Sequence, residues 1–107
     1  MKKEFSKRVC ELAINIPAGR VTTYGQLAKA AGGGGQAARS VSSILSKYPN
    51  QGVIPWHRIV YAGGRVWLTD ECSDKRRELY KLEGIEVNQK GIITNFEEVL
   101  FDFRDMN

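Results

Sequence analysis

The 107-residue sequence predicts a mainly α-helical domain with small β-hairpins, of a winged-helix-like helix-turn-helix architecture. Three observations lead to this prediction. Apolar residues recur at three- and four-residue spacing in the first half, a glycine run separates two short helical segments, and β-branched pairs flank glycine turns later on. Because the length suits one hydrophobic core and no linker-like stretch interrupts it, we expect residues 1–107 to form a single domain.

The first predicted helix covers residues 3–16 and carries an apolar stripe at helical spacing. Its members are Phe5, Val9, Leu12, Ala13 and Ile16. Pro17-Ala18-Gly19 should end this helix. A second helix over residues 24–31 follows a short extended link, with Thr22 or Thr23 as its cap and with Leu27 and Ala31 facing inward.

A third helix is predicted over residues 36–47, with Val41, Ile44 and Leu45 as its buried stripe. We interpret the preceding glycines, residues 32–35, as a turn. They do not fit a phosphate-binding loop, because no strand precedes them and no Gly-Lys-Ser/Thr follows. Two short helices joined by such a turn form a helix-turn-helix, whose second helix normally enters a DNA groove.

The second half alternates short strands with one longer helix. Residues 59–61 and 65–67 predict a hairpin, and residues 85–87 and 92–94 predict a smaller one. Between them we expect a helix over Asp74–Glu83, capped by Ser73 and ended by Gly84, with Leu79 and Leu82 inward. The tail, residues 96–103, has an apolar face that we expect to dock on the core.

Composition narrows the class of protein. Hydrophobic content of 42% and charged content of 26% are ordinary for a globular protein. No apolar run approaches the roughly 18 residues of a membrane span, and the amino terminus lacks a signal core. We therefore expect a cytoplasmic protein, nucleoid-associated or nuclear depending on the organism. Its two cysteines and single histidine lack metal-site spacing, so we expect no metal or other cofactor.

The net charge of +4 conceals an uneven distribution. Residues 1–69 carry ten basic and two acidic side chains, a net charge of +8, whereas residues 70–107 carry six basic and ten acidic ones. A basic first part suits a surface that binds a polyanion, because neutralising phosphates releases counterions.

One stretch, Ile54–Val60, places Trp56 beside the only histidine, His57, and follows them with Arg58. Pro55 predicts a rigid turn before them, and Ile59-Val60 predicts a buried strand after them. Large aromatic and charged residues are costly to bury together unless they have a specific use.

Three motifs taken together resemble one family. They are Thr23-Tyr24-Gly25-Gln26-Leu27-Ala28, Ala37-Ala38-Arg39-Ser40-Val41 and Pro55-Trp56-His57-Arg58-Ile59-Val60. Their order and spacing resemble the DNA-binding domain of the O6-alkylguanine-DNA alkyltransferases over roughly residues 5–84. They are more specifically similar to the alkyltransferase-like proteins, in which tryptophan replaces the reactive cysteine.

This resemblance implies a non-enzymatic sensor of DNA damage. Such a protein would bind O6-alkylguanine in duplex DNA through the minor groove, flip the damaged nucleotide into a Trp-lined pocket and mark it for nucleotide excision repair. It would act without a cofactor and as a monomer. No alkyl transfer is expected at Trp56, because an indole N–H has no nucleophilic lone pair to offer.

The resemblance also assigns site residues. The DNA-binding set is Ser6, Tyr24, Gln36, Ala37, Ala38, Arg39, Ser40 and Ser43. Tyr24 would rotate the nucleotide outward, Arg39 would fill the vacated place in the base stack, and Ala37-Ala38 would allow close approach to the groove. The set expected around the flipped base is Tyr24, Trp56, His57, Arg58 and Val60, with His57 and Arg58 mainly holding the turn by hydrogen bonds.

The sequence departs from the family pattern at three positions, and two other functions are possible. Tyr48 stands where active transferases have a hinge asparagine, Gly25 replaces a commoner polar residue, and Thr69 stands where some relatives have a base-sensing arginine. One alternative is an enzyme in which Cys72 or Cys10 accepts an alkyl group, or His57 serves hydrolysis. The other alternative is a helix-turn-helix transcription regulator that reads an undamaged sequence.

Overall fold

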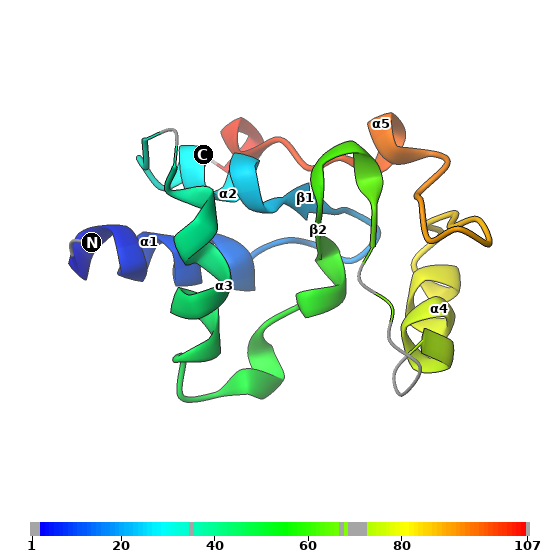
Figure 1. The fold of residues 1–107 in the computed structure, drawn as a ribbon, viewed down its shortest axis with the longest axis horizontal. Coiled ribbons are helices and arrows are strands. Elements are labelled where there is room, and N and C mark those ends of the chain that lie inside the picture. The colour runs from blue at the N-terminus through cyan, green and yellow to red at the C-terminus, as the bar shows by residue number, and fades with distance from the viewer. Residues whose placement is uncertain (1–2, 35, 67, 69–72, 107) are drawn as a thin grey trace.

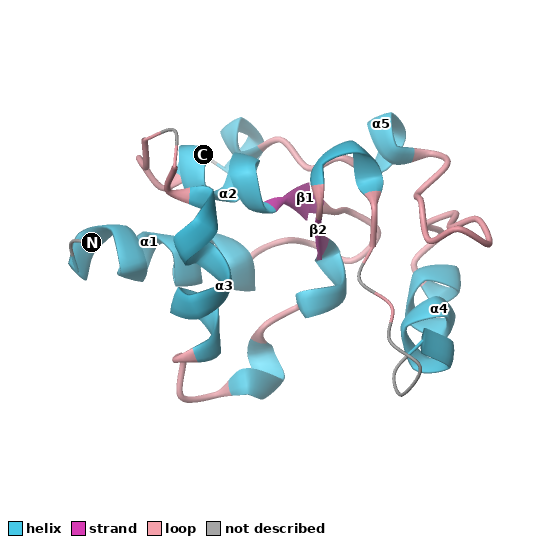
Figure 2. Cartoon of the chain, in the orientation of Figure 1, coloured by secondary structure: helices cyan, strands magenta, loops and turns pink. Residues whose placement is uncertain are grey.

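The computed structural model describes residues 3–34, 36–66, 68 and 73–106, and most of them are helical or in turns (Figures 1 and 2). The helices are α1 (Lys3–Ile14), α2 (Tyr24–Ala30), α3 (Ala38–Ser46), α4 (Ser73–Leu82) and the single turn α5 (Phe96–Val99). The strands are β1 (Thr22–Thr23) and β2 (Ile59–Val60). Figure 1 shows α1, α2 and α3 grouped on one side of these strands and α4 on the other. The predicted mainly helical class is confirmed.

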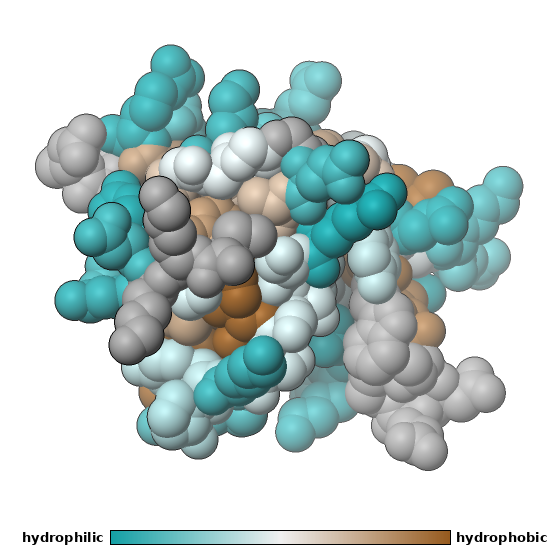
Figure 3. Space-filling view, turned by 60° about the vertical axis from the view of Figure 1, so that its left-hand side comes forward, coloured by the Kyte–Doolittle hydropathy of each residue, from teal (hydrophilic) through white to brown (hydrophobic). Residues whose placement is uncertain are grey.

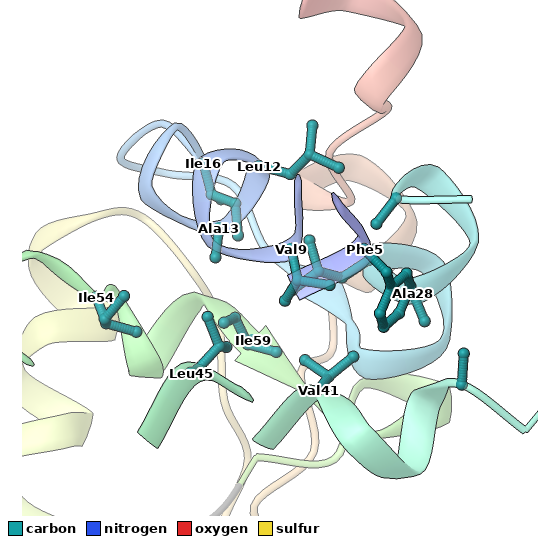
Figure 4. Close-up of a cluster of buried hydrophobic side chains, with 13 residues drawn as sticks. Phe5, Val9, Leu12, Ala13, Ile16, Ala28, Val41, Leu45, Ile54 and Ile59 are labelled. Atoms are coloured by element: carbon teal, nitrogen blue, oxygen red, sulfur yellow. The ribbon is translucent and has the colours of Figure 1, made fainter. Parts of the chain in front are cut away.

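Helices α1, α2 and α3 enclose the first of two hydrophobic clusters (Figure 4). All five residues of the predicted α1 stripe are buried there, and Leu27, Val41 and Leu45 meet them from α2 and α3. Helix α1 ends at Ile14, two residues earlier than expected. The amides of Asn15 and Ile16 bond three residues back instead, at 3.2 and 3.3 Å, so the chain tightens before the proline that follows.

Helix α2 has the predicted cap, and the loop between α2 and α3 is longer than predicted. Thr23 caps α2, because its Oγ1 accepts a hydrogen bond from the Gln26 amide at 3.0 Å. Helix α3 begins at Ala38 rather than at residue 36, since the Ala37 amide bonds to the Gly34 carbonyl at 3.0 Å and continues the turn.

Strands β1 and β2 form a parallel pair that the sequence did not predict, with Thr22 opposite Ile59 and Thr23 opposite Val60. Successive strand residues face opposite sides, so Ile59 packs into the first cluster and Val60 into the second. The second cluster is Val21, Val60, Val66, Tyr80, Ile85, Ile93 and Val99. The strand pair thus joins the two halves of the molecule.

Both predicted hairpins are present in short form. The Tyr61 amide bonds to the Arg65 carbonyl at 2.8 Å across a turn at Ala62–Gly64; Trp67, the last residue of the expected hairpin, lies outside the described residues. In the second hairpin Val87 pairs with Ile93, and the Thr94 amide bonds to the Glu86 carbonyl at 2.7 Å.

Helix α4 is rotated relative to the prediction. Leu82, expected inward, is 77% exposed, whereas Tyr80 is only 1% exposed and fills the second cluster. The expected helix end is confirmed, because Gly84 has a positive φ of 75°, while Ser73 is the first helical residue and its predecessors lie outside the description.

The C-terminal tail docks on the core, as expected. The Val21 amide bonds to the Val99 carbonyl at 2.9 Å, and the Phe101 amide bonds to the Val21 carbonyl at 2.7 Å. Among the described residues, no helix combines the length and the apolar character that a membrane crossing needs.

Candidate nucleic-acid interface

A cavity of about 460 Å³ opens where the start of α2, the middle of α3 and the Trp56 turn meet α4. Its described lining is Tyr24, Ser42, Trp56, Tyr61 and Arg76. Three of these side chains are aromatic, one is a hydroxyl and one is a guanidinium. A cavity with flat apolar walls and few polar groups suits a planar heterocycle.

Tyr24 is the first residue of α2 and forms one wall of this cavity. Its ring lies 5.6 Å from that of Tyr61, measured between centroids, at an interplanar angle of 38°. Burial and the neighbouring Tyr61 raise the pKa of the Tyr24 hydroxyl, so this group stays protonated and can donate a hydrogen bond to a phosphate oxygen.

Trp56 also lines the cavity and belongs to the 3₁₀ turn Trp56–Arg58. Its indole Nε1–H donates to the Gln51 Oε1 at 3.3 Å, and the Gln51 side-chain amide donates to the Leu45 and Tyr48 carbonyls at 2.8 Å each. Gln51 therefore ties the tryptophan to the C-terminal end of α3, which fixes the indole plane.

His57 and Arg58 do not line this cavity but contact Glu83, the residue after α4. The Glu83 Oε2 lies 2.7 Å from the His57 Nε2 and 2.8 Å from the Arg58 Nη2. The Arg58 Nε–H and the Gly19 amide donate to the other oxygen, each at 3.0 Å. Burial alone would raise the pKa of Glu83, but these hydrogen bonds hold it at about 2. The carboxylate is therefore ionised and locks the turn that carries Trp56.

Helix α4 presents one face to the whole site. Arg76 and Tyr80 are four residues apart on α4, and Glu83 follows the last helical residue by one position, so the three lie on one side. Arg76 lines the cavity, Tyr80 packs edge-on against the His57 ring at 5.9 Å, and Glu83 holds His57 and Arg58.

A second concavity, of about 840 Å³, runs between α1 and α3. Its basic and hydroxyl lining is Ser6, Lys7, Arg39, Ser40, Ser43 and Lys47, and apolar side chains such as Ile14 and Ile44 are also part of it. Figure 3, which brings the α1 side of the molecule forward, shows a hydrophobic patch surrounded by hydrophilic side chains. In the part of the chain that the structure describes, the exposed Arg39 guanidinium makes no hydrogen bond or ion pair.

The residues expected to bind DNA divide into four groups. Ser6, Arg39, Ser40 and Ser43 line the α1–α3 groove together, and Tyr24 lines the smaller cavity. Gln36 is exposed in the turn before α3. Ala37 is only 5% exposed and Ala38 is half-buried, so these two alanines pack α3 against the first cluster.

Of the five residues expected around a flipped base, two line the cavity. These are Tyr24 and Trp56. Val60 is buried in the second cluster and does not reach it. His57 and Arg58 make the hydrogen bonds that were expected of them. Thr69 and Cys72 lie outside the described residues.

The described residues offer little for metal or thiol chemistry. No group of three His, Cys, Asp or Glu side chains among them could hold a metal ion. Cys10 is a free, half-buried thiol in the α1–α3 groove, away from the aromatic cavity. Burial and the adjacent Glu11 raise the pKa of Cys10, which keeps it in the unreactive thiol form.

Sequence reasoning missed five residues of this site: Ser42, Gln51, Tyr61, Arg76 and Glu83. A signal existed for Arg76, because Lys75-Arg76-Arg77 is a basic cluster within the acidic part of the chain. The contacts of Glu83 with His57 and Arg58 span 26 and 25 residues, and no local pattern reports them.

The fold and the site define a class of DNA-binding domain, and comparison with known families identifies it. Residues 4–85 match the family described as 6-O-methylguanine DNA methyltransferase, DNA binding domain. The chain belongs to this family and to its alkyltransferase-like, base-flipping branch, which confirms the resemblance found in the sequence motifs.

Two similarities support the placement in this branch. The chain is 40% identical to the DNA base-flipping protein of Escherichia coli over 95 residues, which are 87% of this chain and 73% of the relative. The structure matches that of S. pombe Atl1 in complex with damaged DNA containing O6-carboxymethylguanine with a TM-score of 0.75, at 26% identity over 95% of this chain and 98% of that one.

A methyltransferase provides a useful contrast. The structure of Mycobacterium tuberculosis OGT in complex with DNA matches with a TM-score of 0.60, at 30% identity over 78% of this chain. This chain covers 51% of that protein, so the likeness concerns about half of the methyltransferase.

Proposed function

We propose that this protein is a non-enzymatic sensor of O6-alkylguanine in duplex DNA. It approaches the minor groove with α2 and α3, flips the damaged nucleotide into the cavity between Tyr24 and Trp56, and retains it there unchanged. The observation that carries this proposal is that Trp56 lines the cavity. By the resemblance of its motif, Trp56 stands where a transferase has its reactive cysteine.

Among the described residues, the groups that could support transfer chemistry have no thiol beside them. His57 and Glu83 form a hydrogen-bonded pair of the kind that activates a neighbouring thiol. The Trp56 indole cannot take that part, because its N–H is a donor and is engaged by Gln51. The pair instead stabilises the turn that presents Trp56.

The two concavities lie on different faces of α3 and suit two parts of a damaged duplex. Arg39, near the start of α3, is exposed and available to enter the base stack, while Tyr24 at the cavity wall can donate to the phosphate beside the flipped nucleotide. Flipping costs a few kcal/mol, and the cost is lower at a damaged base. Stacking of the flipped base on the aromatic lining offsets that cost by about 1–3 kcal/mol per base.

Binding without turnover produces a long-lived complex at the lesion. We infer, from the family resemblance, that this complex acts as a marker that nucleotide excision repair proteins recognise, and that the protein binds DNA as a monomer. Purified repair proteins should incise a lesion-containing duplex faster when this protein is bound to it.

The deciding experiment compares two duplexes that differ only in one O6-methylguanine for guanine. Fluorescence anisotropy at physiological salt should show tighter binding to the damaged duplex. Arg39→Ala and Tyr24→Ala should weaken lesion binding roughly tenfold or more, and Trp56→Ala should lower discrimination by about the 1–3 kcal/mol of one stacking interaction. Lys81→Ala, an exposed cation on α4, serves as the control.

Three results would contradict the sensor function. Equal affinity for the two duplexes would remove the lesion claim. Preference for an undamaged sequence would instead favour a transcription regulator. An alkyl adduct on Cys10 or Cys72, detected by mass spectrometry after incubation with the damaged duplex, would favour an enzyme.

A further inference from the structure

The aromatic cavity has one charged wall, Arg76. Of the five described residues that line it, this one alone carries a full charge at neutral pH. It comes from α4, in a part of the chain distant from the Trp56 motif, and its side chain is half-buried. Withdrawing a guanidinium from water among three aromatic rings costs free energy, so its position calls for a physical reason.

The surroundings of Arg76 hold it at the cavity. Tyr80 lies one helical turn further along α4, is 1% exposed and packs against the His57 ring. The guanidinium lies close enough to the Tyr24 and Tyr80 hydroxyls to lower the pKa of each, partly opposing the larger effect of burial, which raises the pKa of Tyr80 to about 12. Both hydroxyls are therefore neutral beside the cation.

The hydrogen-bonding edge of the base decides what a guanidinium can recognise. Guanine presents an acceptor at O6 but an N–H donor at N1. Alkylation at O6 removes the N1 proton, so O6-alkylguanine presents two adjacent acceptors, O6 and N1. An arginine fork donates only and matches paired acceptors, whereas it repels the N1–H of guanine.

We propose that Arg76 is a specificity-determining residue of the cavity and distinguishes O6-alkylguanine from guanine by donating to the O6 and N1 acceptors. This inference rests on the proposed function, since it requires that the base enter this cavity. Trp56 and Tyr24 then supply affinity for any flipped base, and Arg76 supplies the choice between bases.

The test is the ratio of the two dissociation constants, undamaged over damaged duplex, for wild type and for Arg76→Gln. The cost of flipping belongs to the DNA, so it cancels when the ratios of two proteins are compared. The variant should lower the ratio roughly tenfold, as expected when a paired hydrogen bond from a side chain to a base is removed. Its affinity for the undamaged duplex should change much less.

Arg77→Gln is the matched control. It removes the same charge from the adjacent position, but Arg77 donates to the Asn88 and Gln89 carbonyls at 3.1 and 3.3 Å and does not line the cavity. Its ratio should equal that of wild type. Thermal unfolding of each variant should show that the fold is retained.

Each remaining outcome is decisive. If Arg76→Gln weakens the binding of both duplexes by the same factor, Arg76 binds phosphate and the inference is overturned. If wild type itself shows a ratio of one, the proposed function fails first and the inference with it. Should Arg76→Gln be unstable, Arg76→Lys keeps the charge without the fork, and a wild-type ratio in that variant overturns the inference.

Discussion

The orientation of Trp56 depends on residues outside its own motif. Gln51 orients the indole from one side, while Glu83 fixes the following His57 and Arg58 from the other. The motif Pro55–Val60 therefore marks the position of the site, but the geometry depends on the end of α3 and on α4. We expect a substitution at Gln51 or Glu83 to alter base binding, although neither residue lines the cavity that would hold the base.

Glu83 gives a prediction about acid stability. Its folded-state pKa of about 2 is below the usual value of 4.5, so its ionised form stabilises the fold above pH 4.5. That stabilisation is lost as the pH falls from about 4.5 to about 2. With the side chain 11% exposed, Glu83→Gln should cost roughly 2–3 kcal/mol at pH 7.

Urea unfolding as a function of pH checks this prediction. The difference in free energy of unfolding between wild type and Glu83→Gln should shrink as the pH falls from 5 toward 2. Glu78→Gln, on the exposed side of α4, is the control and should leave the curve near that of wild type. A difference that stays constant with pH would assign the cost to packing rather than to the carboxylate charge.

At the scale of the element, sequence periodicity works where one helix packs against one core. All five predicted α1 residues are buried, because a single apolar stripe meets a single cluster. The same reasoning fails for α4, whose inward face is Arg76, Tyr80 and Glu83 and is mostly polar. Leu79 and Leu82 suggested a different face, and the basic cluster Lys75-Arg76-Arg77 was the one local sign of a polar inward side.

The turn between α2 and α3 shows a packing requirement that the glycine run concealed. A Cβ at position 33 would lie 2.5 Å from the Ala37 Cβ and 2.7 Å from the Phe5 Cε1, whereas a Cβ at position 34 would have no neighbour within 4 Å. The run is therefore more than a flexible connection. Gly33 lets the chain pass close to α1, which sets where α3 begins.

Gly33→Ala should accordingly destabilise the fold by about 1–3 kcal/mol through overpacking. Gly34→Ala is the matched control and should change the free energy of unfolding by less than about 0.5 kcal/mol. Chemical unfolding of both variants measures the difference. Equal effects would mean that backbone freedom, rather than close approach to Ala37 and Phe5, is what the turn requires.

At the scale of the whole molecule, the β1–β2 pair explains why the site could be predicted only in part. This parallel pair sets Thr22-Thr23, which precede Tyr24, beside Ile59-Val60, which follow the Trp56 turn. Tyr24 and Trp56 thereby reach one cavity. The family resemblance implied that Tyr24 and Trp56 share one pocket, but a two-residue parallel pair leaves almost no trace in sequence. The pairing that brings them together, and that buries Val60 in the second cluster, could therefore not be predicted.

The basic side chains of the α1–α3 groove predict how DNA affinity depends on salt concentration. Lys7 and Lys47 line the α1–α3 groove with Arg39, whereas Lys81 and Lys90 are exposed elsewhere. Replacing both groove lysines by glutamine should lower the affinity for damaged and undamaged duplexes by the same factor, because phosphate contacts carry no base information. The slope of log affinity against log salt should become shallower by about 0.9 for each phosphate that the variant no longer neutralises. Lys81→Gln with Lys90→Gln removes the same net charge, so an equal change of slope in that control would show that overall charge, rather than the groove, binds the backbone.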